Sequence, residues 1–72
     1  MNLSEKYKEQ NIDRLDVNYG IIEDLKNHEI RTIGDLCQKS KTELKEMDLP
    51  TNDVNKIHVE LQLLGLKLKG AL

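Results

Sequence analysis

The stretch Lys26-Asn27-His28-Glu29-Ile30-Arg31-Thr32-Ile33-Gly34-Asp35-Leu36 contains the point at which one helix is expected to end and the next to begin. Thr32 is a favourable N-cap, and Asp35, three positions later, is placed to return a hydrogen bond to the Thr32 amide as in a capping box. Ile30 precedes the cap and is placed to pack against the new helix as a hydrophobic staple. This stretch therefore predicts a tight corner between two helices.

Similar signals on both sides of this corner predict further helices. Asn18 is placed to cap a helix that ends near Asn27, and an S-x-x-E capping box at Ser40 begins another short helix. Pro50 lacks an N–H and ends that helix, so that the longest helix follows over about Thr51 to Leu64.

Apolar spacing indicates one shared core for these helices. On the last helix, Val54, Ile57 and Leu61 follow i, i+3, i+7 spacing, and Gly65 supplies a left-handed C-cap. The sequence contains no two-residue hairpin turn with alternating flanks. We therefore expect an all-α fold, a compact bundle of four to five short helices.

The N-terminal part of the chain carries weaker signals. Residues 1–12 are polar and are expected to form a short helix that frays unless it docks. Residues 12–17 alternate apolar and charged side chains, which predicts an extended arm that lays Leu15 and Val17 on the core.

Length and composition limit the function classes. The chain has 72 residues and one cysteine, Cys37, so we expect a single small domain without an internal disulfide. No Cys/His cluster has zinc spacing, and neither His28 nor His58 has a nucleophile placed beside it, so no catalytic, cofactor-binding or metal-binding residue is predicted. No apolar run is long enough to cross a bilayer. We expect a cytoplasmic protein that is not an enzyme and has no membrane partner.

Charge disfavours nucleic acid as the partner. Between Asp13 and Glu60 the sequence has eleven acids and seven bases, which gives this part a net charge of −4. Such a surface repels a phosphate backbone unless a dense basic patch overrides it, and the sequence shows no dense patch.

The sequence around the predicted corner resembles that of a known family. Leu25-Lys26-Asn27, Ile30, Thr32-Ile33-Gly34-Asp35-Leu36 and Gln38-Lys39 are similar to the LKxxxIxxIGDLxQ segment of the C-terminal domain of the bacterial RNA polymerase alpha subunit. The resemblance covers 13–68 and leaves an N-terminal segment, 1–12, and a tail, 69–72. It implies a helical fold related to helix-hairpin-helix domains and a role in transcription.

The resemblance fails at the family's DNA contacts. Where that family has a groove-inserting arginine, a supporting asparagine and a Gly-x-Lys-Ser hairpin, this chain has Gly20, Glu23 and Pro50-Thr51-Asn52-Asp53. Asp53 would place an anion where a phosphate sits in the family, and Gly20 has no side chain to reach a groove. The resemblance therefore implies protein contact in place of DNA gripping. Asp16 resembles the surface that faces the sigma factor in that family.

Three apolar residues fall outside the expected core stripes. Val59 and Leu63 are i, i+4 partners on the outer side of the last helix, and Ile21 lies beside the stripe of the helix after Asn18. Either they form a patch for a partner, or the N-terminal segment covers them through Leu3, Tyr7 and Ile12.

Three hypotheses follow, each with its own residues. The first is a transcription-related interaction module that contacts RNA polymerase, sigma factor or a regulator through Asp16, Ile21, Val59 and Leu63. The second is a duplex DNA-binding domain with relocated basic contacts at Arg31, Lys39, Lys41 and Lys45. The third is a homo-oligomer closed by Val59 and Leu63.

Overall fold

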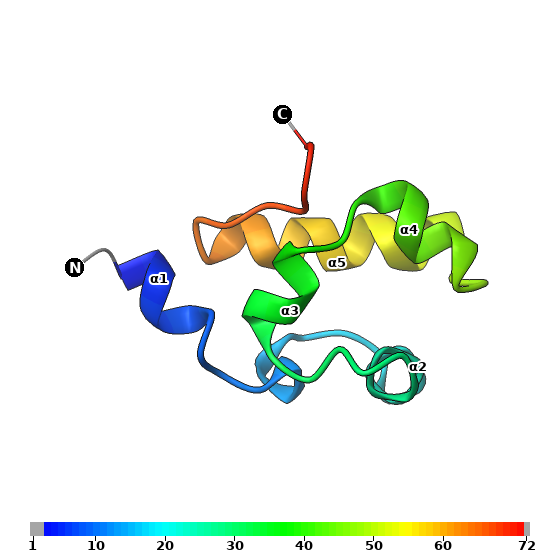
Figure 1. Ribbon diagram of the computed structural model, residues 1–72, viewed down its shortest axis with the longest axis horizontal. Coiled ribbons are helices and arrows are strands. Elements are labelled where there is room, and N and C mark those ends of the chain that lie inside the picture. The colour runs from blue at the N-terminus through cyan, green and yellow to red at the C-terminus, as the bar shows by residue number, and fades with distance from the viewer. Residues whose placement is uncertain (1–2, 72) are drawn as a thin grey trace.

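The computed structural model describes residues 3–71, which form five α-helices and one short 3-10 helix with no β-strand among them (Figure 1). The elements are, in order, α1 (Leu3–Tyr7), η1 (Ile12–Arg14), α2 (Tyr19–Asn27), α3 (Ile33–Cys37), α4 (Lys41–Glu46) and α5 (Thr51–Leu63). The expected all-α fold of four to five short helices is confirmed. In Figure 1, α5 lies across the view, α2 is seen end-on below it, and α3 lies between them.

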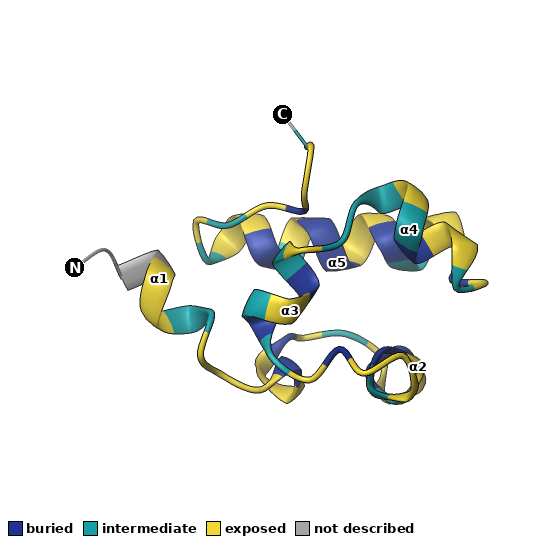
Figure 2. Cartoon of the chain, in the orientation of Figure 1, coloured by how far each residue is buried: buried dark blue, intermediate teal, exposed yellow. Residues whose placement is uncertain are grey.

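The core consists of aliphatic side chains from η1 and from α2 to α5, together with the loops. Its buried members are Ile12, Leu15, Ile21, Ile22, Leu25, Ile30, Ile33, Leu36, Leu44, Leu49, Val54, Ile57, Leu61 and Leu68. Figure 2 shows α5 banded in buried and exposed residues, as expected for a helix with one core face. Since the chain has no Phe or Trp, branched aliphatic side chains provide this packing.

Both predicted capping boxes are present. The Thr32 hydroxyl accepts the Asp35 N–H at 3.0 Å, and the Asp35 carboxylate accepts the Thr32 N–H at 3.1 Å. Ser40 and Glu43 exchange the same pair of hydrogen bonds, each at 3.1 Å. Each box satisfies helix-start N–H groups that have no partner within the helix, which explains why α3 and α4 form despite their short length.

Helices α2 and α5 each end at a residue in the left-handed region. Gly65 has φ of 77°, as predicted, and the Leu66 N–H donates to the Leu61 carbonyl at 2.9 Å. Glu29, with φ of 64°, plays the same part after α2, where the Ile30 N–H donates to the Leu25 carbonyl at 2.9 Å. This Schellman arrangement directs the apolar residue after the cap onto the core.

The expected extended arm over residues 12–17 is wrong in its first half. Ile12–Arg14 is a 3-10 helix, because the Asn11 side chain accepts the Asp13 N–H at 2.9 Å and turns the chain. Leu15 is extended and buried and Val17 is half-buried, as expected for the second half.

The N-terminal segment docks on the start of α3. The carbonyls of Lys8 and Gln10 accept the N–H groups of Gly34 and Ile33, each at 2.9 Å. The Ile12 N–H donates to the Arg31 carbonyl at 3.0 Å, which continues the contact as a short antiparallel bridge. Together with the Thr32 hydroxyl, these carbonyls satisfy the first three N–H groups of α3.

Replacing Glu29 by glycine is expected to raise the free energy of unfolding by about 0.5 to 1 kcal/mol, because glycine adopts the left-handed region without the Cβ penalty. Urea unfolding followed by circular dichroism measures the change. The matched control is Lys45→Gly, an exposed site in the last turn of α4, where glycine should lower stability by about 0.5 to 1 kcal/mol. A loss of stability in both variants would contradict the proposed cost at Glu29.

Replacing Gly34 by alanine is expected to weaken the docking of the N-terminal segment. A Cβ at Gly34 would lie 3.0 Å from the Lys8 carbonyl oxygen, so backbone must move, at a cost of about 1 kcal/mol. Amide hydrogen exchange at Ile33 and Gly34 should accelerate. At Gly20, the control, a Cβ would meet only the Asn18 side chain at 3.3 Å, so Gly20→Ala should leave that exchange unchanged.

Candidate interaction surface

The outer face of α5 carries the most exposed aliphatic side chain among the described residues. Leu63 is 74% exposed and Val59, one turn before it, is 47% exposed. Tyr7 contacts Arg14, with its ring centroid 4.5 Å from the guanidinium carbon, and Ile12 is fully buried in the core. Neither Tyr7 nor Ile12 therefore covers Val59 and Leu63, as the alternative of a covering N-terminal segment required. The Leu3 side chain lies outside the described part of the chain.

Asp16 lies next to this face. Its N–H donates to a Glu60 carboxylate oxygen at 3.2 Å, and the other Glu60 oxygen lies 3.4 Å from the Lys56 ammonium. Because Leu63 is three residues after Glu60, the two side chains are neighbours on the helix surface. We call the surface formed by Val59 and Leu63 the α5 face. The structure thus brings Asp16 to its edge.

Ile21 does not belong to the α5 face. It is 6% exposed and lies in the core, so the expectation that it adds to a surface patch is wrong. α2 buries Ile21 together with Ile22 and Leu25, because the apolar stripe of a packed helix is wide enough to include a residue beside the i, i+3 pair.

One exposed aromatic residue was not predicted. Tyr19, the first residue of α2, is 72% exposed. The neighbouring Glu23 carboxylate raises the pKa of Tyr19. Its position directly after the N-cap Asn18 was the available sequence signal, since the first turn of a helix at a loop is commonly solvated.

The four basic residues of the DNA hypothesis do not form one patch. Lys41 lines a surface depression at the start of α4, while Arg31 lies at the α2–α3 corner and Lys45 is exposed farther along α4. Neither Arg31 nor Lys45 lines the depression.

Lys69, which sequence reasoning placed in a tail, joins Lys39 and Lys41. The Lys69 N–H donates to the Lys39 carbonyl at 2.9 Å, and Ala71 packs against the core. The C-terminal segment therefore folds back on the body of the protein. The fully buried Leu68 was the sequence signal for this return, because an apolar residue between two lysines indicates a chain with one face on the core.

His58 is more buried than a boundary position. It is 9% exposed, and its Nε2 has no hydrogen-bond partner among the described residues. Burial, with the nearby Lys41 charge as the second cause, lowers the pKa of His58. The Arg31 and Thr32 N–H groups lower the pKa of Asp35, and the Ser40 N–H lowers the pKa of Glu43.

Comparison with protein-family models and with curated protein sequences finds no match for this chain. Within residues 3–71, no group of three or more His, Cys, Asp or Glu side chains is arranged to hold a metal ion. No helix in the described part of the chain has the length and apolar character needed to cross a membrane.

Stability is expected to decrease in two steps on acidification. The pKa of His58 is lowered, so the unfolded chain takes up this proton first as the pH falls below 6.5, and stability declines from there. The Asp35 and Glu43 carboxylates stabilise the fold while ionised, and this contribution is lost as the pH falls below about 4. Urea unfolding across this pH range measures both steps.

Two variants separate these steps. His58→Gln should remove the upper step and leave the lower one, whereas Asp35→Asn combined with Glu43→Gln should flatten only the lower one. An unfolding free energy of wild type that stays constant from about pH 7 to 5 would contradict the part assigned to His58.

Proposed function

We propose that this chain is a small interaction module that binds another protein through the α5 face. The observation that carries the proposal is the exposure of Leu63, 74%, beside a half-exposed Val59 on the longest helix. Two adjacent aliphatic side chains held on a rigid helix are suited to act as the anchor of an interface. The patch is small, which favours a transient complex over an obligate one.

The charges around the patch indicate what the partner must offer. Lys56 and Glu60 pair with each other on α5, so neither needs a partner across an interface. The Asp16 side chain is exposed at the edge of the patch. The complementary surface is therefore an apolar pocket with a basic side chain at its rim, facing Asp16.

The resemblance to the RNA polymerase alpha C-terminal domain supports a partner in the transcription machinery. Asp16 matches the position that faces the sigma factor in that family, and it borders the α5 face here. We therefore propose sigma factor, an RNA polymerase subunit or a regulator of the polymerase as the partner. The start of α5 supports protein contact over DNA, because Pro50 has no N–H and Asp53 adds a negative charge in the first turn.

Leu63→Glu is expected to weaken binding to the partner by about 2 kcal/mol, since an aliphatic anchor is lost from the interface. The measurement is an amide NMR titration of the labelled protein with purified sigma factor, then with polymerase subunits. Gln62→Glu is the matched control, because Gln62 is exposed beside Leu63 and the charge change is the same. Equal weakening in both variants would contradict an apolar anchor at Leu63.

The same labelled protein tests the other two hypotheses. If wild type sediments with the mass of a dimer and Leu63→Glu with the mass of a monomer, the partner is a second copy of the chain. Salt-reversible shifts with an A·T-rich duplex around residues 31–45 would replace the protein partner by DNA bound at the relocated basic contacts. Such shifts at 18–24 and 50–54 would replace it by DNA bound in the manner of the alpha C-terminal domain.

A further inference from the structure

A surface depression of about 420 Å³ lies where α4, α5 and the C-terminal segment meet. The side chains that contribute polar groups to its lining are Ser40, Lys41, Thr42, His58 and Lys69. It lies on the flank of α5 that carries His58 and faces α4, whereas the α5 face points outward from the same helix. Figure 1 shows the C-terminal segment returning along α5, and residues 69–71 of this segment line the depression.

One buried polar atom among the residues that line this depression, Nε2 of His58, lacks a hydrogen-bond partner in the described part of the chain. His58 lines the depression and is nine-tenths buried. Buried polar atoms without a partner are rare, because each costs about 1 to 3 kcal/mol. If a rotation of the ring about its Cβ–Cγ bond brings Nε2 to the depression, a hydrogen-bonding ligand there removes this cost.

The charges around the depression specify the sign of that ligand. Lys41 on α4 lies near enough to His58 for its charge to act on the ring, and Lys69 of the C-terminal segment lines the same depression. Lys39 and Glu43 are also near, and the Glu43 carboxylate is already engaged with the Ser40 N–H at 3.1 Å. Among the described residues, two lysines and no carboxylate line the depression, which makes it positive on a chain whose net charge is −2. The ligand is therefore an anion that also accepts hydrogen bonds.

We propose that this depression binds a phosphomonoester group, held by the Lys41 and Lys69 ammonium groups and by a protonated His58. The Ser40 and Thr42 hydroxyls on the rim are additional donors to phosphate oxygens. A concave site for one group suits a terminal phosphate, whose charge approaches two at neutral pH. A duplex backbone presents phosphates along a line, and the acidic surface of the body opposes it.

The proposal is independent of the proposed function, since its residues are separate from those of the α5 face. Binding is expected to couple to protonation of the imidazole. Burial and the Lys41 charge keep His58 neutral when the depression is empty, and an anion beside the ring offsets both effects. Bound phosphate should therefore raise the pKa of His58, and affinity should increase as the pH falls toward 6.5.

The test is an NMR titration of the full chain with inorganic phosphate, then with a nucleoside monophosphate, at constant ionic strength set by sodium chloride. Amide shifts at Ser40 to Thr42, at His58 and at Lys69, together with a raised pKa of the His58 ring, support the proposal. His28 is an internal control, because its ring is exposed and its Nδ1 lies 2.9 Å from the Asp24 carbonyl oxygen. Its ring signals should not shift with phosphate at constant pH.

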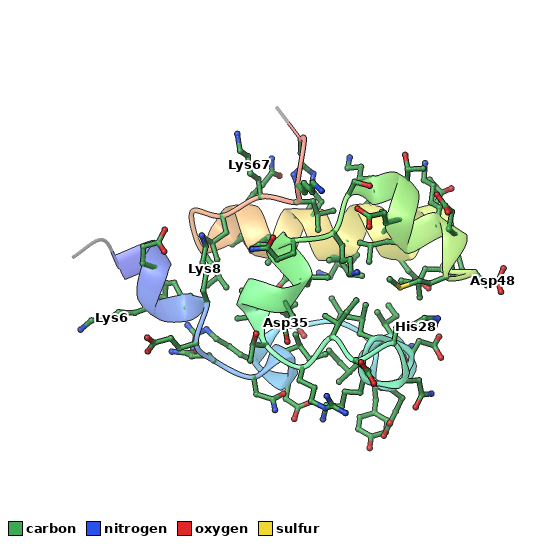
Figure 3. All side chains as sticks on the ribbon, viewed as in Figure 1. Lys6, Lys8, His28, Asp35, Asp48 and Lys67 are labelled. Carbon is green, nitrogen blue, oxygen red and sulfur yellow. The ribbon has the colours of Figure 1, made fainter. Side chains whose placement is uncertain are left out.

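Variants distinguish a site from general charge attraction. Lys41→Gln and Lys69→Gln should each weaken binding about tenfold, the usual scale for losing one charged hydrogen bond. Lys45→Gln and Lys67→Gln are matched controls outside the depression, and Figure 3 shows Lys67 pointing away from the body of the protein. All four changes replace a surface lysine by an uncharged polar side chain and should leave the fold intact. Agreement between the two site variants guards further against an effect on folding.

Three outcomes would overturn the proposal. The first is no shift at tens of millimolar phosphate. The second is equal weakening in site and control variants. The third is salt-dependent binding of duplex DNA at these residues that is tighter than binding of the monophosphate, which would assign the depression to nucleic acid.

Discussion

The N–H groups at the start of α3 are the groups on which the arrangement of this domain depends. α3 has five residues and is too short to be stable alone in water. Its first N–H groups are satisfied by the carbonyls of Gln10 and Lys8 and by the Thr32 hydroxyl. The same contacts fix the N-terminal segment, which has no buried side chain between Glu5 and Asn11 to hold it in place. α3 therefore orders the N-terminal segment, and the N-terminal segment in turn caps α3.

The local parts of this structure could be predicted from the sequence, and the long-range parts could not. The capping boxes at Thr32 and Ser40 and the glycine cap at Gly65 depend on residues at most five positions apart, so local spacing identifies them. The pairing of Lys8 with Gly34 and of Lys69 with Lys39 joins backbone atoms 26 and 30 residues apart and leaves no side-chain signature. Glu29 was missed for a related reason, since a non-glycine residue at a left-handed cap carries no compositional signal.

The same distinction applies to the candidate sites. The outward position of Val59 and Leu63 follows from helical periodicity, which the sequence shows directly. The burial of Ile21 depends on how much of α2 the neighbouring elements cover, which periodicity does not determine. The depression at His58 needs α4, α5 and the C-terminal segment together, so no sequence motif indicated it.

The backbone hydrogen bonds of the two terminal segments have a mechanical consequence. Lys8 bonds at the beginning of α3, and Lys69 bonds to Lys39 just beyond its end. Tension applied between these segments would therefore reach the loop–helix contacts around α3 before it reaches α2 or the body of α5. The two contacts share no hydrogen bond, so each end of this short helix is protected by a different terminal segment.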